Sequence, residues 1–455
     1  MATDRLVRCS AAPIRPAESV EETAGLATRR AAWRVLRRVH TDEAWSSYAV
    51  DRAVGSLPAG ERAFAANLAY MTLRWEGTLD WALAQVLRPG DVDPAVHDVL
   101  RLGAYQLAYG RTPAHAAVST SVALARREIG PHVTGFVNGV LRALDRRWSS
   151  LAWPDEADGE GLGLATGYAG WIVAEAQARF GDDARAVLDA GNRPPGVTLR
   201  ARGQRSGLLT ELRAQGLEPT AGRHAAAAVR VPGAAPAALP AVTEGRATVT
   251  DEASMLVAEA TVSAAGPVDR RPLVLDACAG PGGKAGHLAD LGCAVFAADR
   301  WAHRARRVAD LAELLSVDLA VAVADATAPP WPPAQADVVL LDVPCTGLGV
   351  VRRRPELRWR RRAGDPAELA RLQARILAAS ADLPRRGGAL VYAACTWTIA
   401  ETTAVLTRFL ASDARYRAED PLCNAGSALP DGPGVLLRPD LDDTDGMYLA
   451  VLRRR

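Results

Sequence analysis

The sequence is almost devoid of lysine. Of its 54 basic residues only Lys284 is a lysine, so arginine supplies every other positive side chain. An ammonium is a compact point charge on a flexible stem, whereas a guanidinium is a planar fork. A lone lysine in such a chain therefore indicates a site that needs a compact charge. Lys284 closes a glycine-rich turn at residues 276–284, directly behind a short apolar run.

The sequence also lacks a strong net charge, paired cysteines and long apolar runs. The formal net charge is +2, so any surface that binds nucleic acid must be a local patch. The six cysteines form no CxxC pair and no zinc spacing, which predicts free thiols, a reducing cytoplasm and no metal site. No run of 18 uncharged apolar residues occurs, and residues 1–25 mix acids with arginines. We expect neither a signal peptide nor a membrane span.

The chain is long enough for several domains with cores of their own. It has 455 residues, of which 49% are hydrophobic and 23% charged. Residues 1–25 are predicted to be a flexible tail. Helical spacing of apolar residues predicts a domain of about six helices over 26–148, and a segment rich in Trp, Pro, Gly and acids predicts a linker over 149–165. Residues 166–265 alternate helices with short strands, as expected of a small α+β module.

Residues 266–455 have the pattern of an α/β domain. Near-continuous apolar runs separated by helical segments predict strands at 273–275, 294–298, 319–323, 337–341, 389–392 and 447–451. Such strands are typical of a parallel sheet covered on both faces, the doubly wound Rossmann-like fold. The expected fold class is therefore multidomain, with an all-α domain, an α+β module and an α/β domain in that order.

The glycine turn by itself leaves the ligand open. Glycines after a strand let the backbone turn sharply and approach a ligand closely. Gly280 to Ala285 fits the loose dinucleotide fingerprint, and Asp299 stands where a ribose-binding acid belongs. A Walker A loop fits worse, because Cys278 replaces a required glycine and alanine follows Lys284. NAD and S-adenosylmethionine both remain candidates at this point.

The later strands predict a ligand-binding rim. An aspartate follows each of four successive predicted strands, at positions 276, 299, 325 and 342. Any one of these could cap a helix, but four in register indicate the binding edge of an open α/β sheet. Cys278 and Cys293 are expected to be core thiols. The residues predicted to line the cofactor are Cys278, Ala279, Gly280, Pro281, Gly282, Gly283, Lys284, Asp299, Arg300, Asp325 and Asp342.

Three motifs carry a resemblance to a known family. Residues 276–284, 342–347 and 392–396 resemble the cofactor and catalytic motifs of the RsmB/Sun (Fmu) family of 16S ribosomal RNA (cytosine-5) methyltransferases. Residues 28–147 resemble the NusB-like RNA-binding domain of that family. The resemblance implies S-adenosyl-L-methionine as cofactor, 16S ribosomal RNA, free or in an assembly intermediate, as partner, and a cytoplasmic monomer. Within the helical domain the expected RNA contacts are Arg62, Arg74, Arg101 and Arg142.

The resemblance also implies a role for two cysteines. A thiolate that adds to carbon 6 of cytosine removes its aromaticity, so that carbon 5 can accept a methyl group. Spacing alone does not order the two thiols that follow strands. By resemblance Cys395 is the nucleophile, Cys345 assists proton removal and adduct release, and Asp342 presents a protonated carboxyl to the cytosine edge. Lys284 is expected to stabilise a thiolate or a cofactor carboxylate, or simply to be a rim charge.

The sequence departs from the family beside Cys395, and an arginine-rich segment follows Cys345. Relatives carry Ser-Thr-Cys-Ser and Pro-Glu-Glu-Asn, where residues 393–402 read Ala-Ala-Cys-Thr-Trp-Thr-Ile-Ala-Glu-Thr. The lost hydroxyls predict slower turnover unless Thr396 replaces their hydrogen bonds. The arginine run is expected to bind RNA phosphates while its tryptophan stacks on a base, although a solvated arginine face is the alternative. The predicted RNA contacts are Arg352, Arg353, Arg354, Arg358 and Trp359.

Two other functions remain possible from the sequence. The altered surroundings of Cys395 are compatible with a non-catalytic RNA-binding factor for ribosome assembly that keeps the fold. An NAD oxidoreductase would bind nicotinamide and make no use of Cys345 or Cys395. Because both thiols follow predicted strands, the methyltransferase interpretation uses more of the sequence than either alternative.

Overall fold

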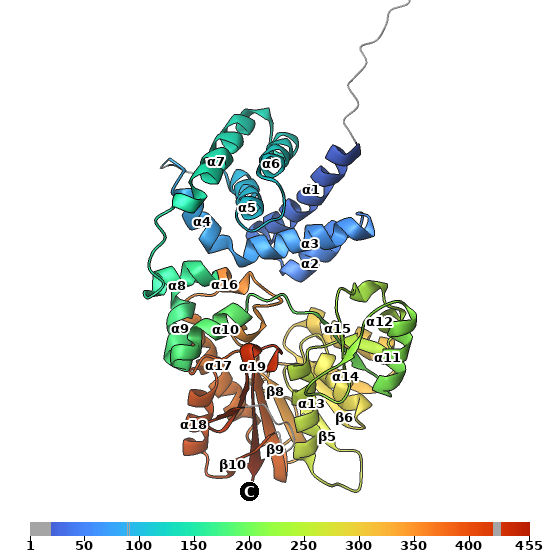
Figure 1. Ribbon diagram of the computed structural model, residues 1–455. Helices are drawn as coiled ribbons and strands as arrows, with labels where there is room; N and C mark the ends of the chain where they lie inside the picture. The colour runs from blue at the N-terminus through green and yellow to red at the C-terminus, as the bar shows by residue number, and fades with distance from the viewer. Residues whose placement is uncertain (1–19, 89, 91, 422–428) are drawn as a thin grey trace, which may run out of the picture. The chain divides into compact units, whose positions relative to one another are not determined.

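The computed structural model describes residues 20–88, 90, 92–421 and 429–455, with side chains from residue 25 onward (Figure 1). The chain divides into two compact units, with the boundary between Ala152 and Trp153. Residues 1–19 of the predicted tail lie outside the described residues, and residues 20–25 belong to the first helix. Cys9 and Cys423 also lie outside the described residues.

The first unit is helical. Its helices are α1 (Val20–Thr41), α2 (Ser46–Val54), α3 (Ala59–Arg74), α4 (Glu76–Ala84), α5 (Pro94–Ala108), α6 (Ala114–Glu128) and α7 (Thr134–Arg147), followed by the 3₁₀ turn Trp148–Ser150. Apolar side chains from all seven helices form one buried core. The sequence predicted about six helices because no glycine or proline separates α3 from α4. The break is a single residue, Trp75, with φ −98° and ψ 12°.

The second unit begins with short helices. They are α8 (Gly159–Thr166), α9 (Gly170–Phe180) and α10 (Ala184–Ala190). Half of the predicted linker is therefore helical. The side chain of Asp158 accepts a hydrogen bond from the backbone N–H of Gly161, and Gly167 ends the helix at φ 69°. Those two caps are present in the sequence, but the surrounding glycines and acids concealed them.

The α+β module follows. Its antiparallel sheet has the order β2-β3-β1-β4, made from β1 (Val197–Ala201), β2 (Thr220–Ala221), β3 (Ala228–Val231) and β4 (Ala247–Val249). Helices α11 (Arg205–Ala214) and α12 (Pro240–Thr243) accompany these strands, and they share a small apolar core. Asp251 caps the next helix, α13 (Glu252–Ala265), by accepting from the N–H of Ala253.

The α/β part is built on a mixed sheet of nine strands among the described residues. Its parallel half has the order β7-β6-β5-β8-β9, from β5 (Leu273–Asp276), β6 (Ala294–Asp299), β7 (Leu319–Val323), β8 (Ala336–Asp342) and β9 (Pro384–Ala394). Strand β13 (Met447–Arg454) pairs antiparallel with β9, and β10 (Tyr416–Glu419) and β12 (Gly434–Leu437) pair with β13. Strand β11 (Leu429–Asp431) completes the edge.

The parallel sheet expected from six predicted strands is thus confirmed for five of them and wrong for the sixth, β13, which runs antiparallel. The apolar content of β13 gives no sign of its direction, because a strand buried on both faces reads the same in either orientation.

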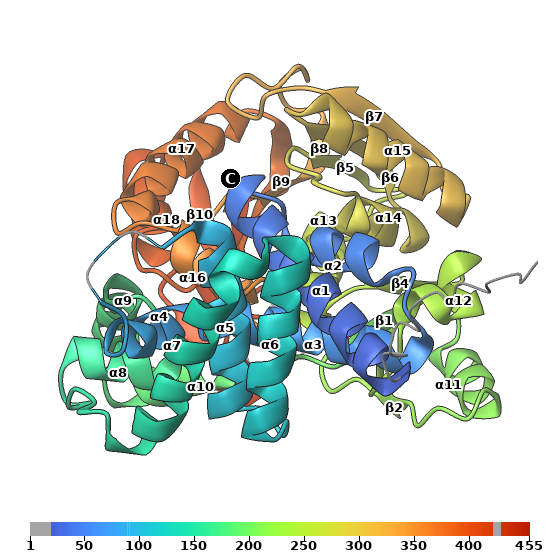
Figure 2. The ribbon, with the colours of Figure 1, turned by 90° about the horizontal axis from the view of Figure 1, so that it is seen from above.

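Helices cover both faces of this sheet (Figure 2). On one face lie α13, α14 (Gly283–Asp290) and α15 (Ala302–Leu315), and on the other α17 (Asp365–Ser380) and α18 (Thr403–Ser412). Two short helices, α16 (Leu357–Arg360) and α19 (Pro439–Asp442), lie in the connections. The core between the sheet and α13–α14 is made of small apolar side chains, including Cys293. Cys293 is fully buried, as expected of a core thiol.

The carboxyl ends of the parallel strands meet at one edge. Asp276 ends β5 beside Ala297 of β6 and Leu340 of β8, and Asp342 ends β8 beside Ala393 of β9. Open α/β sheets bind their ligands at this edge, which makes it the first place to search for a site. None of the helices in the described part of the chain is both long and apolar enough to span a bilayer.

Candidate active site

Two cysteine side chains meet at the carboxyl edge of the sheet. Cys395 follows β9 directly, and Cys345 lies three residues beyond β8, the strand paired with β9. Their Sγ atoms are 3.2 Å apart, which is hydrogen-bond contact for two thiols. The two loops are also packed tightly: the N–H of Gly349 donates to the carbonyl of Cys395 at 3.0 Å. A Cβ at Gly349 would lie 2.0 Å from the carbonyl oxygen of Gly446, so only glycine fits there.

The surroundings make the two thiols unequal. The hydrogen bond from Cys345 holds the pKa of Cys395 below its usual range, and the charges of Lys284 and Arg354 act in the same direction. The same hydrogen bond, together with burial and the charge of Glu401, raises the pKa of Cys345 well above its usual range. Cys395 is therefore the thiol that ionises first, and Cys345 is its hydrogen-bond donor.

The single lysine lies at the same edge. Its Nζ donates to Oδ2 of Asp342 at 2.7 Å. Burial works against the charge of Lys284, but the contact with Asp342 outweighs it and raises the pKa of the ammonium. The role expected for Asp342 at the cytosine edge stays a prediction. Lys284 is more than a rim charge, because it acts on both Asp342 and Cys395.

The glycine turn has the shape of a cofactor cradle. Gly280 and Gly282 adopt φ 58° and 95°, and a Cβ at Gly282 would lie 3.0 Å from the Cα of Val308. No described residue donates a well-formed hydrogen bond to either oxygen of the buried Asp276. Burial, and next the charge of Asp342, raise the pKa of Asp276 to about 7. A buried carboxyl whose oxygens are poorly satisfied, beside such a turn, fits a ligand that brings its own ammonium or sulfonium group.

The other predicted cofactor residues lie along the same rim. Asp299 ends β6 and accepts from the N–H of Gly280 at 3.2 Å and from that of Trp301 at 2.9 Å. Arg300 is exposed and stacks over Trp301. Asp325 is exposed, and hydrogen bonds from the N–H and hydroxyl of Thr327 lower its pKa. Burial raises the pKa of Cys278 well above its usual range, so its thiol stays protonated.

Several residues of this site were not predicted from the sequence. Glu401 is fully buried and accepts hydrogen bonds from Thr346 and Thr398. Arg361 donates to the carbonyls of Cys345 and Thr346 and so holds the first cysteine loop. An acid among three hydroxyl residues in an otherwise apolar stretch, at 396–402, was the available signal for Glu401.

The structure corrects the predicted role of Thr396 as a substitute for the lost hydroxyls beside the nucleophile. Its hydroxyl lies 2.8 Å from that of Thr346 and also donates to Glu401 at 3.4 Å. It is therefore engaged in the hydrogen bonds that join the two cysteine loops, rather than in a bond to the thiol of Cys395.

The structure corrects most of the predicted RNA contacts in the arginine run. Arg358 has 0% exposure, stacks over Tyr168 and donates to the carbonyls of Gly167 and Gly191. Arg352 is buried against the carbonyl of Thr444. These guanidiniums have a structural role inside the protein, because a planar guanidinium with five N–H donors can hydrogen-bond several carbonyls at once.

The remaining residues of the run differ in exposure. Arg353 pairs with Asp251 and Asp445 at 2.8 and 2.9 Å, so it too is occupied within the protein. Trp359 is half-buried and Arg354 is exposed. Arg354 is close enough to Cys395 to lower the pKa of its thiol. It is therefore the residue of the run best placed to meet a phosphate beside the thiols.

Of the four arginines predicted to bind RNA in the helical unit, Arg74 is buried and Arg101 is half-buried. Arg74 has 1% exposure and lies against the sulfur of Met71. Arg101 donates to Asp80 and Asp98 at 2.6 and 3.2 Å. Arg62 donates to the carbonyl of Leu57 but is exposed, as is Arg142. Helical periodicity predicts which residues share a helix face, but it does not show that Asp80 and Asp98 pair with Arg101.

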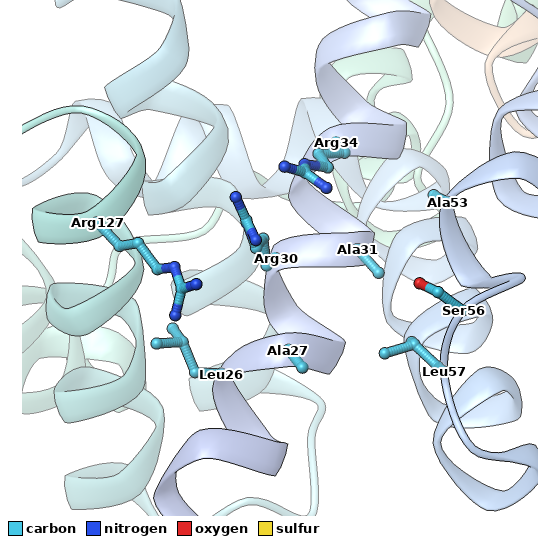
Figure 3. A pocket seen from close by; sticks show the side chains of 9 residues that line it. All are labelled: Leu26, Ala27, Arg30, Ala31, Arg34, Ala53, Ser56, Leu57 and Arg127. Atoms are coloured by element: carbon cyan, nitrogen blue, oxygen red, sulfur yellow. The ribbon is translucent and has the colours of Figure 1, made fainter. Parts of the chain in front are cut away.

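Arginines gather instead around a depression in the helical unit (Figure 3). It has a volume of about 190 Å³ and lies between α1, the end of α2 and α6. Arg30 and Arg34 of α1 and Arg127 of α6 line it, and Arg126 lines a neighbouring hollow. The acid that pairs with this group is Glu128, at 2.5 Å from Arg30 and 4.0 Å from Arg34. The depression therefore keeps a net positive charge.

In the described part of the chain no group of three or more His, Cys, Asp or Glu side chains has the arrangement of a metal site. The groups found at the carboxyl edge are the thiol pair, Lys284 with Asp342, and the glycine turn at residues 278–284.

Comparison with protein families assigns each part of the chain. Residues 265–453 match the model of the 16S rRNA methyltransferase RsmB/F family, and residues 26–146 match the NusB family. Residues 168–238 match a ferredoxin-like domain described as RsmF/B-like.

Individual relatives match over nearly the whole chain. A Mycobacterium tuberculosis protein that carries a provisional methyltransferase name is 40% identical, over 94% of this chain and 96% of that protein. The ribosomal RNA small subunit methyltransferase B of Pseudomonas putida is 32% identical, over 93% of this chain and 98% of that protein.

Solved structures share the fold. The crystal structure of PH0851 covers 94% of this chain and 99% of its own, with a TM-score of 0.82 and 23% identity. The structure of NSun6 from Pyrococcus horikoshii with SFG covers 62% of this chain and 97% of its own, with a TM-score of 0.55 and 19% identity. Both likenesses support the arrangement of strands and helices described above.

Proposed function

The chain belongs to the RsmB/F family of 16S rRNA methyltransferases, and from this premise we propose that it methylates carbon 5 of a cytosine in 16S rRNA through a covalent cysteine adduct. Membership makes it a methyltransferase of ribosomal RNA that uses S-adenosyl-L-methionine. The observation that carries the finer proposal is the contact of Cys345 and Cys395 at 3.2 Å, next to Lys284. Two thiols of unequal acidity suit a reaction that needs first a nucleophile and then a proton acceptor.

Cys395 is the nucleophile of this proposal. Carbon 5 of cytosine is unreactive because its electrons belong to the aromatic ring, and addition of a thiolate to carbon 6 frees them. Cys395 is suited to the addition because Cys345 and Lys284 keep its pKa low. The sulfonium of bound S-adenosyl-L-methionine supplies the methyl group that carbon 5 receives. Residues 278–284, Asp276 and Asp299 would hold that cofactor.

Cys345 completes the cycle. Its pKa is raised first by the hydrogen bond to Cys395, and that cause disappears once the sulfur of Cys395 is bonded to carbon 6. Cys345 can then lose its own proton to solvent and, as a thiolate, accept the proton that leaves carbon 5. Loss of that proton restores the ring double bond and breaks the bond between carbon 6 and the sulfur of Cys395. Within one turnover Cys395 is thus first the nucleophile and then the leaving group, and Cys345 is first a hydrogen-bond donor and then the base.

Methyl transfer can be tested directly. Purified protein, labelled S-adenosyl-L-methionine and 16S rRNA from cells that lack this gene should yield 5-methylcytidine, detected by mass spectrometry of the digested nucleosides. A matched reaction with rRNA from cells that carry the gene should take up little label. No product, together with intact binding of the same rRNA, would instead indicate a non-catalytic assembly factor. A product methylated at another atom would retain the methyltransferase and reject the cysteine-adduct chemistry.

The arginines around the depression in the helical unit are proposed to contact RNA phosphates. Replacing Arg34 and Arg127 together by alanine should weaken rRNA binding about tenfold at low salt. Each lost contact with single-stranded RNA should also reduce the slope of log K against log salt by about 0.7. Filter binding of the full chain over a salt series measures both quantities. Arg146→Ala is the matched control, because that exposed arginine lies on α7, was not predicted to contact RNA and does not line the depression.

A further inference from the structure

A buried carboxylate lies beneath the two cysteine loops. Glu401 belongs to the connection between β9 and α18, and its exposure is 0%. Its own carbonyl accepts a hydrogen bond from the hydroxyl of Tyr392 at 2.6 Å, which anchors the backbone of Glu401 to β9. Burial raises the pKa of Glu401, while its hydrogen-bond donors work against that rise. A carboxylate in such a place is costly unless its oxygens are well satisfied.

The carboxylate joins the residues that follow the two cysteines. Oε1 accepts from the backbone N–H of Thr346 at 2.8 Å, and Oε2 accepts from its hydroxyl at 2.6 Å. Oε2 also accepts from the hydroxyls of Thr398 and Thr396, at 2.8 and 3.4 Å. The hydroxyls of Thr346 and Thr396 lie 2.8 Å from each other. Thr346 follows Cys345 and Thr396 follows Cys395, so a single carboxylate holds both cysteine loops.

A second side chain fixes the carboxylate from α17. Gln373 Nε2 donates to Oε1 of Glu401 at 3.2 Å and to the carbonyl of Pro344 at 2.9 Å. Pro344 precedes Cys345, so the first cysteine is held on both sides. The two loops come from different strands. Besides the contact of the two sulfurs and the backbone bond from Gly349 to Cys395, the hydrogen bonds of Glu401 and of its threonine partners join them. The position of one sulfur relative to the other therefore depends strongly on Glu401.

We infer that Glu401 is a positioning residue that holds Cys345 and Cys395 in contact and keeps Cys345 in the protonated state before the nucleophile attacks. This inference depends on the proposed function, because it assigns a task within that reaction. Its electrostatic part has support of its own, since the charge of Glu401 is one of the causes that raise the pKa of Cys345. A neutral side chain of the same shape would fill the space without supplying that charge.

The test separates the charge of Glu401 from its packing. Glu401→Gln keeps the size of the side chain and removes the charge. Glu401→Gln is compared with its parent, and both carry Cys395→Ala. Cys345 is then the thiol of the pair that reacts with iodoacetamide. Alkylation of Cys345 is measured as a function of pH, and its midpoint should move to lower pH by about one unit when Gln replaces Glu401. Glu401→Asp, which keeps the charge, should stay closer to the parent profile.

The kinetic part uses the full chain with both cysteines. Glu401→Gln should lower kcat at least about tenfold, with the KM for rRNA within about twofold of the parent value. Thr396→Val removes one hydroxyl between the loops, leaves the carboxylate in place and should lower kcat by less. If Glu401→Gln does not fold, Thr396→Val still tests the positioning, because an unchanged kcat there would count against it. Thermal unfolding of each variant shows whether folding is affected.

Two results together would overturn the inference. The pH profile of Cys345 alkylation would be unchanged in Glu401→Gln, and kcat would fall only in proportion to the loss of folded protein. The alkylation needs no RNA and no cofactor. If the wild type failed to methylate rRNA while the alkylation profile still shifted, the proposed function would fail and the electrostatic role of Glu401 would stand.

Discussion

Replacement of Cys395 by alanine is expected to lower kcat for methyl transfer by at least about three orders of magnitude, because Cys395 is the one described thiol whose pKa is lowered. The described cysteines are Cys278, Cys293, Cys345 and Cys395. Cys345 is in contact with Cys395 but is kept protonated, and Cys293 lies in the core. The variant should still bind rRNA, and label transfer in a single turnover measures the loss.

The same replacement should abolish the covalent complex with RNA. Cytosine that carries fluorine at carbon 5 has no proton to lose there, so an adduct formed by the wild type should survive a denaturing gel. Cys395→Ala should give no such band. Cys293→Ala removes a thiol outside the site and serves as the control, with an adduct like that of the wild type. A persistent band in Cys395→Ala would mean that another residue attacks carbon 6.

Much of the site could be predicted from the sequence because it follows strand ends. Short apolar runs identify buried parallel strands, and in such sheets the residues after each strand share one edge. That reasoning alone gathers Asp276, Asp299 and Asp342, and it puts Cys345 and Cys395 at the same edge. The order of the two thiols needed the resemblance, and it agrees with the pKa lowering of Cys395 by Cys345 and Lys284.

The arginine run shows where such reasoning stops. A guanidinium that binds phosphate and one that satisfies buried carbonyls have the same letter in the sequence. Arg358 is buried because Tyr168, Gly167 and Gly191 surround it, and all three come from a segment more than 150 residues earlier. The partners of Arg101 in the helical unit are likewise acids from other turns or helices. Only the folded chain brings these partners together.

Hydrogen bonds between loops are equally hidden. Glu401 looks like an isolated acid in the sequence, and its partners Thr346 and Gln373 belong to two other parts of the chain. The direction of β13 is hidden for a related reason, since pairing with β9 is a property of two distant segments. Local sequence patterns therefore predict the residues at the rim of the site. The residues that hold the loops in place, such as Glu401, are identified only from the structure.

Replacement of Cys345 by alanine is expected to leave attack possible and to block release, so that a covalent protein–RNA complex accumulates on ordinary, unfluorinated rRNA. The reason is that loss of the proton from carbon 5 needs an acceptor, and Cys345 is the thiol in contact with the nucleophile. Turnover should fall by about two to four orders of magnitude, the range for loss of a general base. A denaturing gel with labelled rRNA measures the complex, and the wild type should show little of it.

The pH dependence of that complex adds an independent check of the assignment. Cys345 lowers the pKa of Cys395, so its removal should raise that pKa. The thiolate of Cys395 then exists only at higher pH, and adduct formation in Cys345→Ala should require more alkaline buffer than in the wild type on fluorinated RNA. If the roles were exchanged, Cys345→Ala would give no adduct at any pH and Cys395→Ala would accumulate it. An adduct with an unshifted pH profile would retain the roles and reject the hydrogen bond as the cause of the low pKa.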